Sequence, residues 1–144
     1  MSAMQSWCYI VGIHPKNLTK EEILLLEAEL FIRICAELKE QQRIQYKDYF
    51  RLMKFTVEME NAMLEANFLR LIIHDIIATE EYDLRGIAYY TNTHEDVVQE
   101  IASGCNTRPS AILLQRTIEL HRSVRRDLYY AIMKKISSEY AIAV

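Results

Sequence analysis

Residues 84–110 read LRGIAYYTNTHEDVVQEIASGCNTRPS. This stretch contains two short helical segments, 84–90 and 94–102, on either side of the polar turn 91–93. Asn92 in the turn tolerates the left-handed backbone conformation that a sharp reversal requires. The stretch therefore predicts two short helices that pack against each other across a tight turn.

Residues with known start and stop preferences mark the ends of these helices. We expect Asp83 to cap the first helix and Thr93 the second, because short polar side chains accept hydrogen bonds from the free N–H groups of a first turn. Gly104 is expected to end the second helix in the left-handed conformation. Pro109 is expected at the first position of the next helix, where proline is favoured.

The apolar residues of the two helices predict how they cross. The first helix has the small Ala88 at the expected crossing point, and Val98 and Ile101 are spaced to point inward from the second. A small residue, a turn residue that accepts positive φ and inward apolar residues are what a helix-turn-helix requires. The stretch therefore predicts this motif.

The motif resembles the lambda-repressor-like (Cro-type) helix-turn-helix proteins. The residues that carry the resemblance are Ile87-Ala88, Thr91-Asn92-Thr93, Val98, Ile101, Ala102-Ser103-Gly104 and Arg108-Pro109-Ser110. This chain has Asn92 where the family typically has glycine and Leu84 where it typically has glutamine. The resemblance covers roughly residues 65–122. It implies that the helix over 94–102 enters the major groove of DNA.

The resemblance also implies which side chains would contact DNA. The side chains expected to face the bases are His94, Glu95, Asp96, Gln99 and Glu100, of which Gln99 suits adenine and Glu95 the amino group of cytosine. The phosphate contacts are expected from Arg85, Asn92, Thr93, Arg108 and Arg116. Because phosphates repel the three carboxylates on this helix, the alternative is a helix-turn-helix that contacts protein instead of DNA.

The N-terminal half of the chain predicts a long helical hairpin. A capping box formed by Thr19 and Glu22 starts a helix that runs to about Gln41. A second helix is expected over 47–77, where apolar residues recur with a period near 3.5 at Leu52, Phe55, Met59, Ala62, Ala66, Leu69, Ile73 and Ile76. This repeat fits either a coiled-coil seam between two chains or a hairpin within one chain.

A seam between two chains would make the protein a homodimer. The predicted dimerisation residues are Leu52, Phe55, Met59, Leu69 and Ile73. The corresponding division of the chain is an N-terminal helical region over 1–64 and a helix-turn-helix domain with a C-terminal helix over 65–144. That last helix runs to about residue 138 or breaks near Ser123.

Composition excludes several other classes of protein. The 144 residues include three glycines and two prolines, too few for a fold rich in β-turns or hairpins. The glycines are isolated, which argues against a glycine-rich phosphate loop. The cysteines (Cys8, Cys35, Cys105) and the four histidines are scattered, so we expect no metal site and no cofactor. No nucleophile stands beside a base in a catalytic pattern, so we expect no enzyme.

The charge of the chain is uneven. The net charge is −3, but residues 108–135 contain seven Lys or Arg and two Asp or Glu, a local balance of +5. This fits either phosphate contact or a solvated helix face. The sequence shows no convincing signal peptide and no apolar run long enough to span a membrane, so a cytoplasmic protein is expected.

These observations predict an all-α protein in which a long helical hairpin leads into a lambda-repressor-like helix-turn-helix unit. The predicted function is that of a transcriptional regulator that binds double-stranded DNA, as a dimer. One alternative is a non-enzymatic protein–protein interaction protein whose helix-turn-helix no longer binds DNA. Another is a regulator that senses a small molecule in a pocket between the N-terminal helices.

Overall fold

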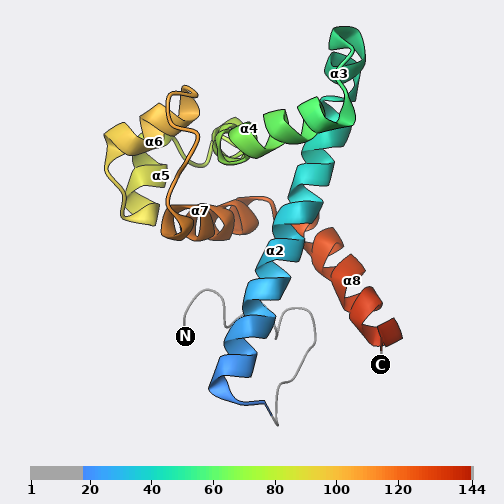
Figure 1. Cartoon of the computed structure of the whole chain (residues 1–144). Coiled ribbons are helices and arrows are strands. Elements are labelled where there is room, and N and C mark those ends of the chain that lie inside the picture. Colours follow the sequence, from blue (N-terminus) through green and yellow to red (C-terminus); the bar gives the residue numbers. More distant parts are fainter. Residues whose placement is uncertain (1–17, 144) are drawn as a thin grey trace. The chain divides into compact units, whose positions relative to one another are not determined.

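The computed structural model describes residues 18–143, which form seven helices and no strand (Figure 1). The helices are α2 (Lys20–Gln45), α3 (Lys47–Met53), α4 (Val57–Ala78), α5 (Leu84–Thr91), α6 (Glu95–Ala102), α7 (Ala111–Val124) and α8 (Arg126–Ala143). The all-α prediction is confirmed for this part of the chain. None of these helices combines the length and the apolar character needed to cross a bilayer.

Two compact units make up the described residues. Unit 1 contains residues 18–38 and 126–143, and unit 2 is Lys39–Arg125. These units are divided at other positions than the predicted domains 1–64 and 65–144, and that domain assignment stays a prediction. Unit 2 contains every residue that the sequence assigns to DNA contact.

Unit 1 joins the first part of α2 to α8. The predicted capping box is confirmed, because the N–H of Glu22 donates to Thr19 Oγ1 and the N–H of Thr19 donates to Glu22 Oε1, each at 3.2 Å. Lys135 Nζ on α8 lies 2.8 Å from Glu37 Oε1 on α2. Arg33 and Glu139 form a second ion pair between the same helices. These contacts connect segments about 100 residues apart in sequence.

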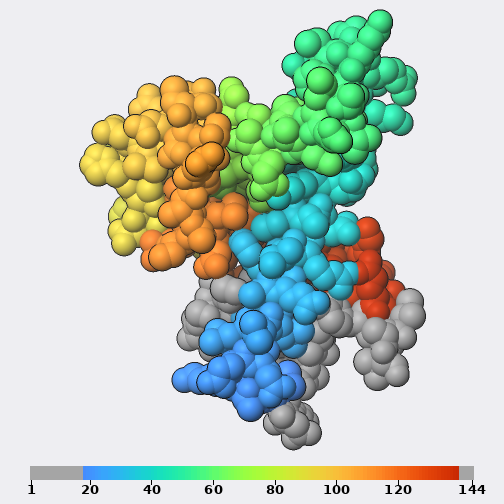
Figure 2. All heavy atoms as spheres, in the orientation of Figure 1, coloured from blue at the N-terminus to red at the C-terminus, as the bar shows by residue number. Residues whose placement is uncertain are grey.

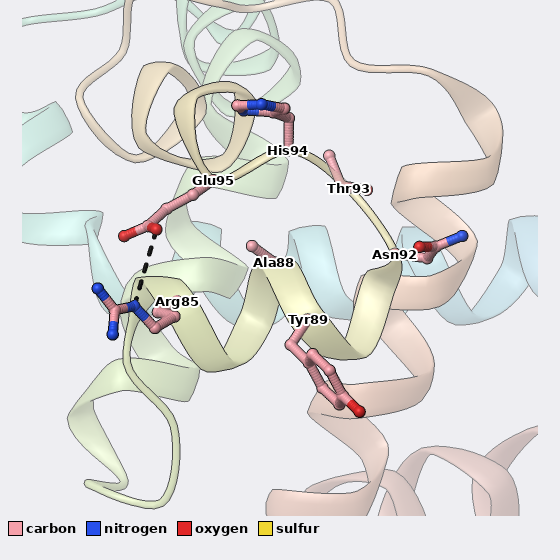
Figure 3. A pocket seen from close by; sticks show the side chains of 7 residues that line it. All are labelled: Arg85, Ala88, Tyr89, Asn92, Thr93, His94 and Glu95. Carbon is pink, nitrogen blue, oxygen red and sulfur yellow. Dashed lines mark ion pairs between the residues drawn. The ribbon is translucent and has the colours of Figure 1, made fainter.

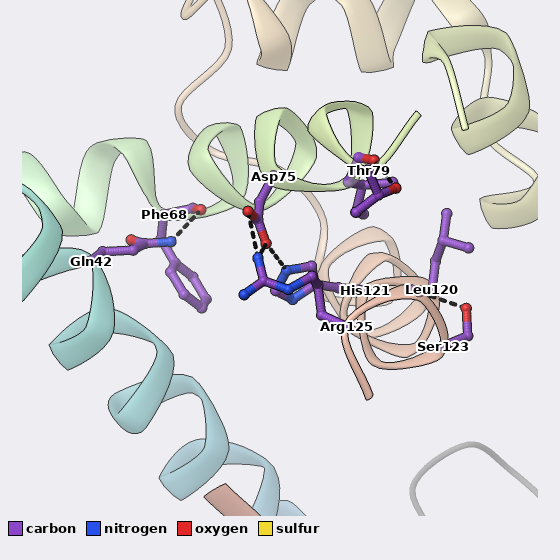
Figure 4. A network of polar contacts seen from close by, with 9 residues as sticks. Gln42, Phe68, Asp75, Thr79, Leu120, His121, Ser123 and Arg125 are labelled. Carbon is purple, nitrogen blue, oxygen red and sulfur yellow. Dashed lines mark hydrogen bonds and ion pairs between the residues drawn. The ribbon is translucent and has the colours of Figure 1, made fainter. Parts of the chain in front are cut away.

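The last turns of α2 belong to unit 2 and run beside α4. Lys39 Nζ lies 2.6 Å from Glu65 Oε2, and the side-chain amide of Gln42 donates to the carbonyl oxygen of Phe68 at 3.4 Å (Figure 4). The ammonium of Lys39 also lies 5.1 Å from the centre of the Phe68 ring, within range of a cation–π interaction. α2 continues to Gln45, four residues beyond its predicted end.

The prediction of one continuous helix over 47–77 is wrong. α3 ends at Met53, Lys54 adopts the left-handed conformation with φ 56°, and α4 begins at Val57 with Thr56 as its N-cap. The rings of Phe50 and Phe55 stack across this break, with centroids 5.9 Å apart. Tyr49 meets both rings edge-on. Packing of these three aromatic rings offsets the cost of a left-handed lysine.

The break also separates the predicted dimerisation residues. Leu52 and Met59 are 80% and 53% exposed, and Phe55 is half-buried beside the break. Leu69 and Ile73 are buried, so a second chain reaches these two side chains only if unit 2 opens. The dimerisation role itself stays a prediction.

The core of unit 2 forms where α4 meets the helices that follow it. α4 packs against α6 and α7, and α5 also packs against α6 and α7. The apolar side chains that α4 and α7 bury are Leu64, Phe68, Leu69, Ile72, Ile73, Ile76, Leu113, Ile118 and Leu120. A core of this size stabilises α5 and α6, each of which is too short to be stable alone in water.

A polar cluster fastens the end of α7 to α4. Asp75 Oδ2 accepts hydrogen bonds from His121 Nε2 and Arg125 Nη1, both at 2.6 Å, and Oδ1 accepts a second bond from Arg125 at 2.7 Å (Figure 4). The hydrogen bond from His121 is the largest cause that lowers the pKa of Asp75, and partial burial opposes it. Arg125 lies between α7 and α8, so the predicted alternative of a break near Ser123 is confirmed.

Candidate nucleic-acid interface

Local signals place α5 as the sequence predicts. Asp83 is its N-cap and accepts a hydrogen bond from the N–H of Gly86 at 2.8 Å. Asn92 is its C-cap and has φ 52° and ψ 46°, so the predicted left-handed turn residue is confirmed. Arg116 on α7 donates from Nη1 to the carbonyl oxygen of Thr91 at 2.9 Å. The side chain of Arg116, predicted to bind phosphate, thus already caps the end of α5.

The start of α6 differs from the prediction. Thr93 does not cap this helix, because its hydroxyl donates to the carbonyl oxygen of Thr91 at 3.2 Å. His94 takes the N-cap position with an extended backbone and no side-chain capping bond. The first turn instead contains Glu95 and Asp96, whose charges are favourable near the positive end of the helix dipole.

The predicted end of α6 is confirmed, whereas the predicted start of α7 is wrong. Gly104 has φ 85°, so the predicted left-handed stop is confirmed. Pro109 is not the first residue of α7, because Ser110 is the N-cap and accepts a hydrogen bond from the N–H of Leu113 at 3.1 Å. α7 therefore begins after Ser110, because the serine hydroxyl accepts a hydrogen bond from an N–H group of the first turn and a proline side chain cannot.

The inner faces of α5 and α6 are buried and the outer face of α6 is exposed. Ala88, Val98 and Ile101 are at most 5% exposed, which confirms their predicted inward positions. The exposed residues of α6 are Glu95, Asp96, Gln99 and Glu100. Figure 2 shows α5 and α6, in yellow and amber, at the surface of unit 2. The predicted base-reading side chains are therefore accessible together on one short helix.

A hollow lies between α5 and the start of α6. Its lining residues are Arg85, Ala88, Tyr89, Asn92, Thr93, His94 and Glu95 (Figure 3). Six of these seven are polar or aromatic, and five belong to the predicted DNA-contact set. Tyr89, which the sequence left outside that set, is 90% exposed beside them. The hollow therefore brings the predicted contacts of both helices to one place.

Long polar contacts join several side chains of this surface. Arg85 Nε lies 3.8 Å from Glu95 Oε2, with both side chains at least half exposed. His94 Nδ1 lies 3.7 Å from Asp96 Oδ2. Exposed pairs at such distances contribute little free energy, so another anion can replace the carboxylate beside Arg85. Arg108 is exposed on the loop before α7 and forms none of the ion pairs found among residues 18–143.

Two residues that the sequence gives no reason to connect with α6 hold its end. Arg70 Nε donates to the carbonyl oxygen of Ala102 at 3.3 Å, and His74 Nε2 lies 2.9 Å from the same oxygen. A carbonyl oxygen only accepts, so His74 is also a donor there. Both residues belong to α4, about 30 positions before α6, and no local sequence signal indicates this contact.

The surface offers hydrogen-bond donors, hydrogen-bond acceptors and exposed cations. No cluster of three or more His, Cys, Asp or Glu that could hold a metal ion occurs among residues 18–143. Comparison with known proteins adds no identity, because no family model, curated protein or solved structure matches the chain.

Proposed function

We propose that this protein is a transcriptional regulator that binds double-stranded DNA through α5 and α6, as in the lambda-repressor-like helix-turn-helix proteins that its sequence resembles. One observation carries the proposal. α5 and α6 pack across a turn with a left-handed Asn92, bury Ala88, Val98 and Ile101, and leave the outer face of α6 exposed. This is the arrangement in which a helix can enter the major groove.

The dimensions and chemistry of α6 fit this role. With its side chains an α-helix is roughly 10–12 Å in diameter, which fits the major groove of about 12 Å in width. Gln99 offers a donor and an acceptor to adenine, and Glu95 can accept from the amino group of cytosine. The carboxylates of Glu95, Asp96 and Glu100 restrict where the helix can approach, because each is repelled by phosphate unless a base donor meets it.

Two exposed arginines are the proposed phosphate contacts. Arg85 leaves its 3.8 Å pair with Glu95 at little cost, which frees Glu95 for a base edge and Arg85 for a phosphate. Arg108 extends from the loop that follows α6. Two arginines on opposite sides of α6 in sequence can fix its register on the duplex.

The proposal includes a homodimer, since two recognition helices on one duplex bind far more tightly than one. Leu52 and Met59 support it, because both apolar side chains are exposed on unit 2. The acidic face of α6 favours a second candidate function, in which α6 binds a basic protein surface and no DNA.

Binding to a fluorescently labelled mixed-sequence duplex, measured by anisotropy as a function of salt, tests the proposal. Binding is expected at low salt and should weaken steeply as salt rises. The double variant Arg85→Ala/Arg108→Ala should reduce the slope of log K against log salt by about 2, because each phosphate contact contributes roughly 0.9.

The control variant is Lys47→Ala/Arg51→Ala, which removes the same charge from exposed positions on α3. It should leave the slope close to that of the natural chain. An equal reduction of the slope in both double variants would show that DNA binding depends only on net charge and not on Arg85 and Arg108. No duplex binding at low salt, by a chain whose mass in solution is that of a dimer, would favour the second candidate function.

A further inference from the structure

A second hollow in unit 2 lies beside the residues that hold the end of α6. It has a volume of ≈ 400 Å³ and is lined by residues of α4, including Asn67, Arg70 and His74, and by Tyr46 and Tyr49 from the start of α3. This volume lies in the range of small-molecule sites. Asn67, Arg70 and His74 are spaced by three and four residues along α4, so they lie on one face of that helix.

Arg70 gives this hollow its charge. The side chain is partly buried, and it takes part in none of the ion pairs found among residues 18–143. Its guanidinium donates from Nε to the carbonyl oxygen of Ala102 and from Nη1 to Asn67 Oδ1, both at 3.3 Å. A guanidinium has five N–H donors, so three are left for a further acceptor. An anion that binds beside a partly buried cation without a carboxylate partner gains a favourable charge interaction.

The other walls determine what kind of anion fits. Tyr46, Tyr49, Met63 and Leu71 contribute ring and aliphatic surface. An inorganic anion uses none of this surface, whereas a flat apolar body fills it and removes it from water. The carboxylate of such a ligand matches the remaining fork of guanidinium donors in bidentate geometry.

We propose that this hollow is an effector site for a small aromatic carboxylate, held by Arg70 and coupled through Arg70 to α6. The carboxylate would use the guanidinium N–H groups of Arg70 that do not bind Ala102 or Asn67. The hydrogen bond from Arg70 to Ala102 at the end of α6 is therefore kept, and the bound ligand restricts the motion of the Arg70 side chain. Ligand binding therefore favours the α6 position seen here. The binding of the ligand is independent of the proposed DNA function, but its effect on DNA affinity rests on that function.

The first experiment tests the site without DNA. The full chain, labelled with ¹⁵N, is titrated with benzoate and with indole-3-acetate, each compared with its uncharged carboxamide, and amide shifts are followed by NMR. Both acids should shift the backbone amide signals around Arg70 and Ala102 in a saturable manner at millimolar concentrations. The two carboxamide ligands should bind at least tenfold more weakly. Equal shifts with acid and amide, or no saturable shift with either acid, would overturn the proposal.

The variants Arg70→Gln and Arg70→Lys assign the effect to this side chain. Glutamine removes the charge and lysine keeps it without the fork, so binding of the acids should be lost in the first and weakened in the second. Arg51→Gln removes an exposed arginine from α3 and should change nothing. Unchanged acid binding in Arg70→Gln would overturn the proposal. The comparison of acid with amide on the natural chain decides the matter even if an Arg70 variant does not fold.

The second experiment measures duplex affinity with and without saturating indole-3-acetate. The acid should raise the affinity several-fold, and the duplex should raise the affinity for the acid by the same factor. An acid that binds through Arg70 but leaves duplex affinity unchanged would overturn the coupling. Arg70-dependent acid binding by a chain that binds no duplex would refute the proposed function while the ligand site stands.

Discussion

Replacement of Asp75 by asparagine should destabilise unit 2 without changing the shape of the side chain. In the natural protein the carboxylate accepts three short hydrogen bonds, one from His121 and two from Arg125. The asparagine oxygen can take the place of Oδ2 and keep the two bonds made there. Its NH₂ group then faces Arg125 Nη1, where a donor meets a donor 2.7 Å away.

The expected loss follows from burial and charge. A hydrogen bond to a charged group contributes about 1.5–3 kcal/mol when it is buried. His121 is 1% exposed, but the side chains of Asp75 and Arg125 are 35% and 40% exposed, so solvent screens the ion pair with Arg125. We therefore expect Asp75→Asn to lower the free energy of unfolding by about 2 kcal/mol.

Denaturant unfolding followed by circular dichroism measures this loss, with Glu81→Gln as a control. Glu81 is exposed and forms none of the ion pairs found in the described residues, so its variant should stay within about 0.5 kcal/mol of the natural chain.

The pH dependence tests the cause of this loss. The pKa of Asp75 is lowered below 3.8, so its contribution is fully present above that pH and is lost as the pH falls through the folded-state value. The difference in the free energy of unfolding between Asp75→Asn and the natural chain should therefore become smaller in acid. Equal free energies of unfolding at neutral pH would refute this reasoning, as would a difference that stays the same on acidification below pH 3.8.

Substitutions at three further positions test local features of the site by the same unfolding measurement. Asn92→Val should cost about 1–2 kcal/mol because a β-branched residue is strained at φ 52°, whereas Asn92→Gly should be tolerated; equal effects would contradict the assigned turn. Ser110→Ala should cost about 1 kcal/mol through loss of the cap on α7, and an unchanged free energy would disprove that cap. Gly104→Ala should cost about 1 kcal/mol or more, since its backbone has φ 85° and the added Cβ would lie 3.0 Å from Arg70 Nη1; a neutral effect would argue against this contact.

The features predicted from the sequence are those that depend on neighbouring residues. Capping by Thr19 and Asp83, the left-handed turn at Asn92 and the stop at Gly104 each involve groups only a few positions apart. Short-range hydrogen bonds and backbone sterics are the same in most surroundings, so residue type alone indicates them. The inward positions of Val98 and Ile101 follow from helical periodicity in the same way.

The features that could not be predicted depend on contacts between distant segments. No glycine or proline marks the break at Lys54, which is stabilised by the packing of Phe50 and Phe55. Arg125 binds Asp75, fifty positions earlier, and no local pattern indicates this pair. The bonds that fix the end of α6, from Arg70 and His74, also come from another helix. Local patterns therefore outline α5 and α6, while tertiary contacts determine how they are held.

Contact between the outer face of α6 and DNA is the central feature of the proposed function. The most direct test is an NMR titration of the ¹⁵N-labelled chain with a mixed-sequence duplex at low salt, which reports contact residue by residue. The largest amide shifts should fall in α5, α6 and the loop around Arg108, and α3 should be little affected. Amide shifts in α3 as large as those in α6, or no shift in any of these segments, would contradict DNA contact through α6.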